Sequence, residues 1–290
     1  MTKRIYILLA TYNGEKYLRE QLDSLFRQTY QNWILWIHDD NSEDNTVNII
    51  KEYKKKYPDK IIFLDDNVST GGAKENFAYL LNSIDDNFDY LMFCDQDDVW
   101  LEDKIEVTLN KMLELEKENP DKPILVHTDL KVVDDKLNII SDSMFKYQKV
   151  NLNNQYDLKK LVVENVVTGC TMMLNKKLVN IVKEIPKEAV MHDWWIAIMT
   201  LKMEGIIYFL NKSTVLYRQH SLNIVGARKI GFLYYFKKLL KVKSVLASYI
   251  YIIRQYRKAG IDMSLLNFIL IKFTLVVNKL LNFNNNVYFT

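Results

Sequence analysis

The sequence predicts an α/β fold with a mostly parallel, doubly wound sheet and helices on both faces. Two observations predict it: short apolar runs alternate with helix-like segments as far as Pro120, and a cluster of polar residues follows each apolar run. Because strand-helix-strand connections are right-handed, repeated units of this kind build a parallel sheet covered on both sides. The 290 residues suffice for one large or two small domains.

The expected elements follow in order. Strands are predicted over residues 5–10, 33–38, 61–64 and 89–94, and helices over residues 15–28, 47–57, 74–84 and 102–118. The first helix places four apolar residues on one face: Leu18, Leu22, Leu25 and Phe26. Beyond Pro120 the alternation is looser, with strands expected over residues 124–127, 166–175 and 206–210 and helices over residues 157–164, 176–183 and 193–203. This half is expected to extend the same sheet and cover its carboxyl edge.

Composition and simple motifs indicate an ordinary globular protein and argue against a disulfide-stabilised, a secreted, a dinucleotide-binding and a P-loop protein. With 49% apolar and 26% charged residues, the chain is an ordinary globular protein. Cys94 and Cys170 lack CxxC spacing and are expected to be reduced core residues. No cleavage pattern follows Met1, so no signal peptide is expected and the predicted compartment is the cytoplasm. Neither a GxGxxG nor a GxxxxGKS motif is present, which argues against a dinucleotide fold and a P-loop.

The apolar run at residues 90–94 ends in three carboxylates: Asp95, Asp97 and Asp98. Neighbouring carboxylates raise one another's pKa unless a positive group lies among them, and oxygen ligands suit Mg2+ or Mn2+. The alternative is a solvated acidic turn before a capped helix. Polar residues also follow the other strands, at residues 11–14, 39–44 and 65–72. In a parallel sheet these segments share one rim, where a nucleotide is expected to bind.

Five motifs resemble those of family 2 glycosyltransferases with the GT-A fold. In the family's order and spacing, they are Ala10-Thr-Tyr-Asn-Gly14, Asp39-Asp-Asn-Ser-Glu-Asp44, Cys94-Asp-Gln-Asp-Asp98, Met191-His-Asp-Trp-Trp195 and Tyr217-Arg-Gln-His220. Each motif is weak alone, but five in register over residues 3–223 are specific. The resemblance implies a GT-A domain over residues 1–225 and leaves residues 226–290 as a basic helical tail.

The resemblance implies a donor site. Tyr12 resembles the aromatic residue that stacks on the base, and Asp40 resembles the carboxylate that accepts a hydrogen bond from N3–H of uracil or thymine. Capping of the next helix is the alternative for Asp40. Lys74 and Arg218 are expected at phosphates, with a solvated lysine and a pair with a surface acid as alternatives. The predicted donor-binding residues are Thr11, Tyr12, Asn13, Asp40, Gly71, Lys74, Asn76, Asp95 and Arg218.

The resemblance also implies a metal site. Asp95 is expected near the ribose or the metal, and Asp97 is expected to bind a Mg2+ or Mn2+ ion that bridges the donor diphosphate. Neutralising the diphosphate makes it a leaving group, so loss of the ion should abolish turnover. His220 resembles a residue that completes the metal or phosphate site, and a structural histidine is the alternative.

Asp193 resembles the base of an inverting transferase. Displacement at an anomeric carbon requires a carboxylate that takes the proton of the attacking hydroxyl. Trp194 and Trp195 would raise the pKa of Asp193 and offer stacking surfaces, and with Gly169 they form the predicted acceptor and sugar pocket. The alternatives are that Asp193 caps its helix, that the tryptophans fill the core and that Gly169 relieves a bulge.

The tail is strongly basic. Residues 228–290 contain eleven Lys and Arg and the single acid Asp262, a net charge of +10, against −7 for the remainder. Residues 230–246 have the composition of an amphipathic helix, and residues 265–281 are apolar but make a poor transmembrane span. The tail is therefore expected on an anionic membrane surface. The alternative is a helical pair packed on the catalytic domain, which would bury Tyr249, Ile252 and Ile253.

Together these observations predict an inverting, metal-dependent glycosyltransferase on the inner face of the cell membrane. It would move a sugar from a nucleoside diphosphate to a lipid-linked or polysaccharide acceptor. The segments at residues 94–100, 126–129 and 217–221 look most like those of bacterial rhamnosyltransferases that use dTDP-rhamnose. Alternatives are a transferase that uses UDP-glucose or UDP-galactose and a non-catalytic nucleotide-sugar-binding membrane subunit. Nucleic acid is not an expected partner, because the main body is acidic.

Overall fold

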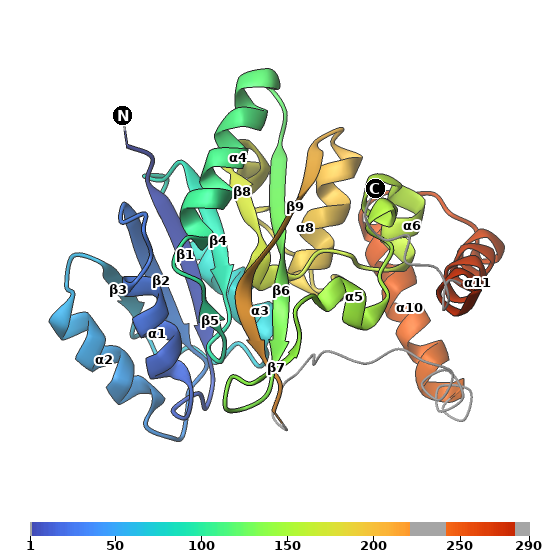
Figure 1. The fold of residues 1–290 in the computed structure, drawn as a ribbon. Coiled ribbons are helices and arrows are strands. Elements are labelled where there is room, and N and C mark those ends of the chain that lie inside the picture. Colours follow the sequence, from blue (N-terminus) through green and yellow to red (C-terminus); the bar gives the residue numbers. More distant parts are fainter. Residues whose placement is uncertain (1, 221–241, 282–290) are drawn as a thin grey trace.

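The structure, a computed structural model, describes residues 2–220 and 242–281. Within them, nine strands form one sheet in the order β3-β2-β1-β4-β8-β6-β9-β5, with β7 paired to β6 (Figure 1). The strands are β1 (Ile5–Thr11), β2 (Trp33–Asp39), β3 (Ile61–Leu64), β4 (Tyr90–Cys94), β5 (Val99–Trp100), β6 (Ile124–Val133), β7 (Ile139–Ser141), β8 (Met173–Asn175) and β9 (Ile206–Arg218). The long ladders are parallel and the short ones antiparallel, which confirms the predicted mostly parallel sheet.

Helices cover both faces of the sheet. They are α1 (Leu18–Phe26), α2 (Thr46–Lys56), α3 (Ala73–Ser83), α4 (Lys104–Glu118), α5 (Met144–Gln148), α6 (Leu158–Val163), α7 (Lys176–Val182), α8 (His192–Lys202), α10 (Val242–Lys258) and α11 (Leu265–Leu281), with short 3-10 turns at Leu152–Tyr156 and Gly169–Thr171. The bounds of the helices in the first half differ from the predicted ones by a few residues at most.

Alternation along β1 explains the two-sided core. Successive side chains of a strand point to opposite faces, and every residue from Ile5 to Leu9 is buried. Ile5, Ile7 and Leu9 pack with α1, α2 and α4, whereas Tyr6 and Leu8 pack with α3, α7 and α8. A strand apolar on both faces is what a parallel sheet between two helical layers requires.

The prediction of a strand over residues 166–175 is wrong for most of its length. Only Met173–Asn175 pairs with its neighbours, and Gly169–Thr171 forms a 3-10 turn. The β-branched residues Val166 and Val167 are buried in the core without joining the sheet. Tertiary packing therefore overrides the local strand preference here. Conversely, β6 and β9 run several residues beyond their predicted ends, because they pair with each other along most of their length.

The C-terminal helices α10 and α11 pack beside α6 (Figure 1). Ile252 is buried in this contact and Tyr249 and Ile253 are partly buried, as the alternative for the tail predicts. Of the predicted amphipathic helix at residues 230–246, only residues from Val242 onward lie in the described part of the chain. The predicted domain boundary at residues 225–226 also lies outside it and stays a prediction. None of the described helices combines the length and apolar character needed to cross a membrane.

Candidate active site

The strand register brings the predicted rim together. Thr11 at the end of β1 pairs with Asp39 at the end of β2, and Leu9 pairs with Cys94 at the end of β4. The polar segments that follow these strands therefore leave the sheet at one edge, as predicted. Thr11 is buried, and its hydroxyl donates to Asp39 Oδ1 at 2.7 Å.

The loop that follows β1, residues 12–14, is hydrogen-bonded to the acidic segment that follows β4. The Gln96 side chain accepts a hydrogen bond from Tyr12 N at 2.8 Å and donates one to Tyr12 O at 2.9 Å. A Cβ on Gly14 would lie only 2.4 Å from Gln96 Oε1, so a larger residue would displace the Gln96 side chain. The Tyr12 side chain is 54% exposed, and Asn13 binds the next loop by accepting from Glu43 N at 2.8 Å.

The Asp40 carboxylate organises the loop before α3. It accepts hydrogen bonds from Thr70 N and from Gly71 N, the latter at 3.0 Å. Gly71 has φ +83°, in the left-handed region that favours glycine, with open space beside its Cα. Asp40 is therefore engaged within the protein, and its predicted contact with a base stays a prediction.

Asn76 and Lys74 tie α3 to its surroundings. Asn76 is buried, its Oδ1 lies 2.8 Å from His38 Nδ1, and its Nδ2 donates to Thr11 O at 3.3 Å. Lys74 Nζ donates to Lys187 O and Ala189 O, both at 3.0 Å, just before α8. The structure thus places both residues at the rim, where they hold protein groups. Their contacts with a donor stay predictions.

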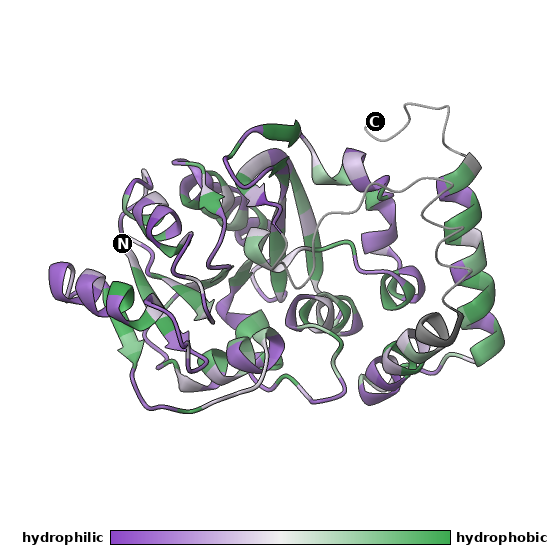
Figure 2. Cartoon of the chain, turned by 90° about the horizontal axis from the view of Figure 1, so that it is seen from below, coloured by the Kyte–Doolittle hydropathy of each residue, from purple (hydrophilic) through white to green (hydrophobic). Residues whose placement is uncertain are grey.

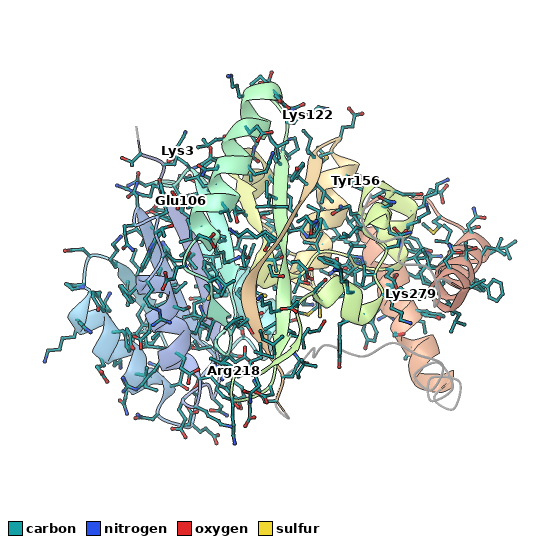
Figure 3. All side chains as sticks on the ribbon, viewed as in Figure 1. Lys3, Glu106, Lys122, Tyr156, Arg218 and Lys279 are labelled. Carbon is teal, nitrogen blue, oxygen red and sulfur yellow. The ribbon has the colours of Figure 1, made fainter. Side chains whose placement is uncertain are left out.

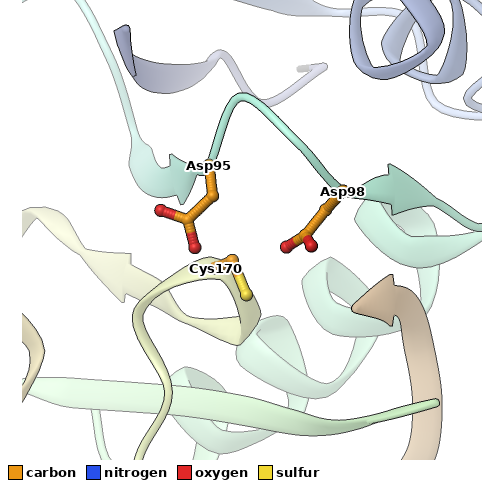
Figure 4. Close-up of side chains that lie close together, drawn as sticks. All are labelled: Asp95, Asp98 and Cys170. Atoms are coloured by element: carbon orange, nitrogen blue, oxygen red, sulfur yellow. The ribbon is translucent and has the colours of Figure 1, made fainter. Parts of the chain in front are cut away.

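Asp95 and Asp98 point toward Cys170 from the turn after β4 (Figure 4). One ligand atom from each of the three residues lies within 4.8 Å of the others. Burial and the charges of Asp97 and Asp193 raise the pKa of Asp95 to about 7. Burial and the charges of Asp97 and Asp95 raise the pKa of Asp98 well above its usual value. Both carboxyl groups therefore favour the protonated form near neutral pH unless a cation lies among them.

Mg2+ or Mn2+ fits part of this cluster. Asp98 Oδ2 is buried, and the neighbouring Cys170 thiol is the one described side chain that lowers the Asp98 pKa, so this oxygen is open to a cation. Burial raises the pKa of the Cys170 thiol, so the sulfur stays protonated and poorly suited to a hard ion. Asp95 and Asp98 are therefore suitable ligands, and Cys170 is not.

The other predicted metal ligands form a pair of their own. His220 Nε2 lies 2.8 Å from Asp97 Oδ2, and its ring lies 4.8 Å from that of Tyr17. Because the Asp97 charge also acts on Asp95, the pair borders the acidic cluster. The structure thus brings Asp95, Asp97 and His220 to one region, and their role as metal ligands stays a prediction.

Arg218, labelled in Figure 3, lies at the end of β9 and holds protein groups. Its Nε donates to Asp97 O at 2.8 Å, one terminal nitrogen donates to Asp135 O at 2.7 Å, and the other pairs with Glu20. The side chain is 1% exposed, and its guanidinium lies over the Tyr17 ring. Arg218 therefore fixes the acidic turn in place and pairs with an acid, as its alternative role predicts.

Asp193 lies in the first turn of α8 and is not the cap of that helix. Burial raises its pKa to about 6, although hydrogen bonds from the backbones of Trp194 and Gly169 and from the Asn165 side chain act in the opposite direction. Gly169 N donates to Asp193 Oδ2 at 3.1 Å. Since the charges of Asp193 and Asp97 both act on Asp95, the predicted base and the predicted metal-binding pair surround one carboxylate.

Of the three residues predicted for the acceptor pocket, Gly169 and Trp194 contact Asp193 through their backbone N–H groups. Trp194 is 9% and Trp195 6% exposed, and both belong to the core beside α8, the alternative given for them. Trp194 Nε1 also donates to Leu161 O at 2.6 Å. Little ring surface remains for a sugar. A Cβ on Gly169 would lie 2.7 Å from His192 Nε2, so the absence of a side chain at residue 169 lets its backbone lie against the His192 ring.

Several residues of the site were not predicted as functional. Gln96, Lys104 and Asn165 all contact or flank the acidic cluster or Asp193. Lys104 is fully buried, with its Nζ 4.4 Å from the centre of the Trp100 ring. A lysine in the first turn of a charged helix normally faces solvent, so the sequence carries no signal for it. Asp98, in contrast, belongs to the acidic cluster that the sequence itself predicts.

Residues 6–180 match the sequence profile described as Glycosyl transferase family 2, which is more than half of the chain. The chain belongs to this family. This family 2 glycosyltransferase is 29% identical over 278 residues to the dTDP-rhamnosyl transferase RfbG of Shigella flexneri, covering 87% of this chain and 89% of that protein. It is 26% identical to the UDP-Glc:alpha-D-GlcNAc-diphosphoundecaprenol beta-1,3-glucosyltransferase WfgD of Escherichia coli, covering 61% of this chain and 62% of that protein.

Two solved structures share the fold of this family 2 glycosyltransferase. S. aureus TarS 1-349 in complex with UDP-GlcNAc has a TM-score of 0.53 at 21% identity, covering 76% of this chain and 60% of that one. The mannosyltransferase PcManGT from Pyrobaculum calidifontis, in complex with GDP-Man and Mn2+, has a TM-score of 0.62 at 12% identity, covering 96% of this chain and 70% of that one. The predicted fold and enzyme class are confirmed.

Proposed function

We propose that this enzyme transfers rhamnose from dTDP-rhamnose to a hydroxyl of a lipid-linked or polysaccharide acceptor, with inversion, during synthesis of cell-surface polysaccharide. The observation that carries the proposal is the similarity to the dTDP-rhamnosyl transferase RfbG, because it extends over most of both chains. Similarity to the UDP-Glc-dependent WfgD covers a smaller part of each chain and supports a UDP-sugar as the alternative donor.

Asp193 is the proposed base. It takes the proton from the acceptor hydroxyl as that oxygen attacks the anomeric carbon and the diphosphate leaves from the opposite face. A raised pKa of about 6 supports this role, because such a carboxylate is ionised at neutral pH yet basic enough to accept a proton. The hydrogen bond from Gly169 N fixes Oδ2 of Asp193, so the carboxylate is held in one orientation.

Asp95 and Asp97, with His220, are the proposed ligands of a Mg2+ or Mn2+ ion, and Asp98 is a further candidate. A bound ion supplies charge neutralisation of the leaving diphosphate. The raised pKa values of Asp95 and Asp98 support a cation among these carboxylates. The Mn2+ named in the PcManGT complex supports the choice of metal.

A panel of nucleotide sugars tests the donor. Hydrolysis of dTDP-rhamnose, UDP-glucose and UDP-galactose would be compared with Mg2+ or Mn2+ present. The proposal expects dTDP-rhamnose to give the highest kcat/KM, and faster turnover of a UDP-sugar would overturn the choice of donor. Asp193→Asn tests the base, with a loss of transfer on the order of 100- to 10,000-fold and near-normal donor binding. Asp121→Asn, the same change at a carboxylate that is 97% exposed, is the matched control.

We also propose that the outward face of α11 rests on the anionic inner surface of the cell membrane. Its exposed apolar residues are Leu265, Leu266, Ile269, Leu270 and Phe273. Arg254, Arg257 and Lys258 are exposed on the neighbouring α10 and supply positive charge for anionic headgroups. Figure 2 shows the hydrophobic colouring along much of α11, at the edge of the molecule. An exposed apolar face bordered by cations is typical of a helix in the membrane interface.

Vesicle flotation tests the membrane contact. The protein is expected to bind phosphatidylglycerol vesicles and to bind neutral phosphatidylcholine vesicles more weakly. Leu266→Gln combined with Leu270→Gln should abolish binding, whereas Ile140→Gln, at an exposed apolar residue of β7, should leave it unchanged. Equal recovery of all three proteins with either vesicle would overturn the proposal.

A further inference from the structure

The tail is attached to the catalytic body through a buried carboxylate. Glu164 follows α6, and its Oε1 lies 3.0 Å from Lys279 Nζ and 3.6 Å from Lys272 Nζ, both on α11. Lys272 Nζ also lies 3.3 Å from Val163 O. Glu164 and the two lysines are each less than 20% exposed, so water screens these ion pairs poorly. Figure 3 labels Lys279 on the side of the molecule where α6 and the tail meet.

The charges of this cluster depend on one another. Burial alone would raise the pKa of Glu164, but the ammonium groups of Lys279 and Lys272 hold it below its usual value. Glu164 is therefore ionised when the tail is docked. Without its two lysines it would be a buried, uncompensated charge, which is strongly unfavourable.

Glu164 is followed directly by the segment that holds Asp193. The side chain of Asn165 lies close enough to Asp193 to lower its pKa, and Asn165 Oδ1 accepts a hydrogen bond from Val167 N at 3.0 Å. Gly169 N then donates to Asp193 Oδ2. Residues 164–169 therefore join the tail at one end and the Asp193 carboxylate at the other.

A second attachment lies on the other side of Asp193. Gln255 of α10 is buried, and its Oε1 accepts a hydrogen bond from Val190 N at 2.7 Å. Val190 precedes Asp193 by three residues, just before α8 begins. The tail thus holds both chain segments that converge on Asp193, one through an ion pair and one through a hydrogen bond.

From this geometry we propose that Glu164 is a positioning residue, and that the docked C-terminal helices form part of the scaffold that orients Asp193 for catalysis. The inference rests on the proposed role of Asp193 as the base. The tail acts on Asp193 indirectly, through residues 164–169, through Val190 and through α8 itself, whose Lys202 Nζ donates a hydrogen bond to Ala259 O. If the tail were a membrane anchor alone, these contacts would not matter to a soluble acceptor.

Glu164→Gln is the main test, because it removes the charge and keeps the shape. With a soluble acceptor and without vesicles, kcat for transfer should fall by about tenfold or more, since a displacement of about 1 Å can cost on the order of 100-fold. The KM and the calorimetric Kd for the donor should stay within twofold. Glu114→Gln is the matched control, because Glu114 forms a surface ion pair with Lys111 on α4.

Lys279→Gln is the second variant, because Lys272 remains to pair with Glu164 and the fold is disturbed less. It should lower kcat in the same direction, and Glu164→Gln with Lys279→Gln together should be no worse than Glu164→Gln alone. Such non-additivity is the signature of one shared interaction. If both single variants melt at lower temperature but keep the wild-type kcat below that temperature, Glu164 serves only stability and the inference is wrong.

The same measurements separate this inference from the proposed function. If Asp193→Asn retains transfer, the assignment of the base fails whatever the Glu164 variants do. If Asp193→Asn is inactive while Glu164→Gln transfers at the wild-type rate, the assignment of Asp193 as the base is supported and the positioning role of Glu164 is wrong.

Discussion

Gly169→Ala should damage the site without changing any ionisable group. A Cβ at this position would lie 2.7 Å from His192 Nε2, 3.2 Å from His192 Cε1 and 3.6 Å from Asp193 Cβ. Non-bonded heavy atoms prefer separations of about 3.5–4.0 Å. The closest contact is therefore short by roughly 1 Å, and either the imidazole or the backbone of residue 169 must move by that amount.

The imidazole has little room to move. His192 is 3% exposed, and its ring centre lies 4.3 Å from that of Phe77 and 4.9 Å from that of Phe93. Displacing the backbone of residue 169 instead would lengthen the 3.1 Å hydrogen bond from Gly169 N to Asp193. Overpacking of this kind costs about 1–3 kcal/mol in stability. A shift of about 1 Å at the base can lower the rate on the order of 100-fold.

The assay compares kcat, donor Kd and melting temperature for Gly169→Ala and Gly205→Ala. A Cβ at Gly205 would lie 2.5 Å from Pro123 O, at the opposite edge of the sheet, so this variant should lose stability and keep its kcat. Gly169→Ala should lose both stability and kcat while binding donor normally. If Gly169→Ala keeps its kcat within twofold although it is destabilised as much as Gly205→Ala, the link between this glycine and Asp193 is refuted.

Three further predictions concern charge. Because a protonated carboxyl cannot act as a base, kcat should fall tenfold per pH unit below the Asp193 pKa of about 6, and a flat rate profile from pH 5 to 8 would contradict this. Burial lowers the pKa of Lys104 to about 8, so the folded protein releases this proton at a lower pH than the unfolded chain does. Between pH 7 and 10, the free energy of unfolding of the wild type, measured with urea, should therefore rise by about 2–3 kcal/mol relative to that of Lys104→Met. An equal response of both proteins would show that Lys104 is not desolvated. EDTA should abolish transfer and Mn2+ or Mg2+ should restore it, whereas activity that survives chelation would exclude an essential ion.

The order of elements in the first half was predictable because each strand has a continuous apolar sequence. Residues of β1 and β4 are buried on both faces, and only a strand between two helical layers requires such a run. The segment at residues 166–175 shows the limit of this reasoning. Val166 and Val167 have strand propensity, but the chain there must reach Asp193 with its backbone, and the contact from Gly169 N is invisible in local sequence.

The rim of the site was predictable because strand ends and carboxylates are local features. The partners of those carboxylates were not, since they come from distant parts of the chain. Arg218 reaches the acidic turn from β9, and its five donors are occupied mainly by protein oxygens at Asp97, Asp135 and Glu20. A motif can show that an arginine lies near an acidic cluster, but only the fold shows which groups it binds.

The tail illustrates the same limit for charge. Lysines on an apolar helix normally reach outward to headgroups, so the sequence assigns Lys272 and Lys279 to the membrane side. In the structure they face Glu164 on the same stripe as the buried Phe268 and Leu275, and the opposite stripe of α11 is apolar and exposed. These two cations are therefore not available to lipid. Because each lysine at an anionic surface contributes about 1 kcal/mol to binding, the electrostatic attraction of the tail to a membrane is weaker by that amount for each of them. Any affinity of α11 for a bilayer must depend mainly on its apolar face, and should resist salt more than the net charge of the tail suggests.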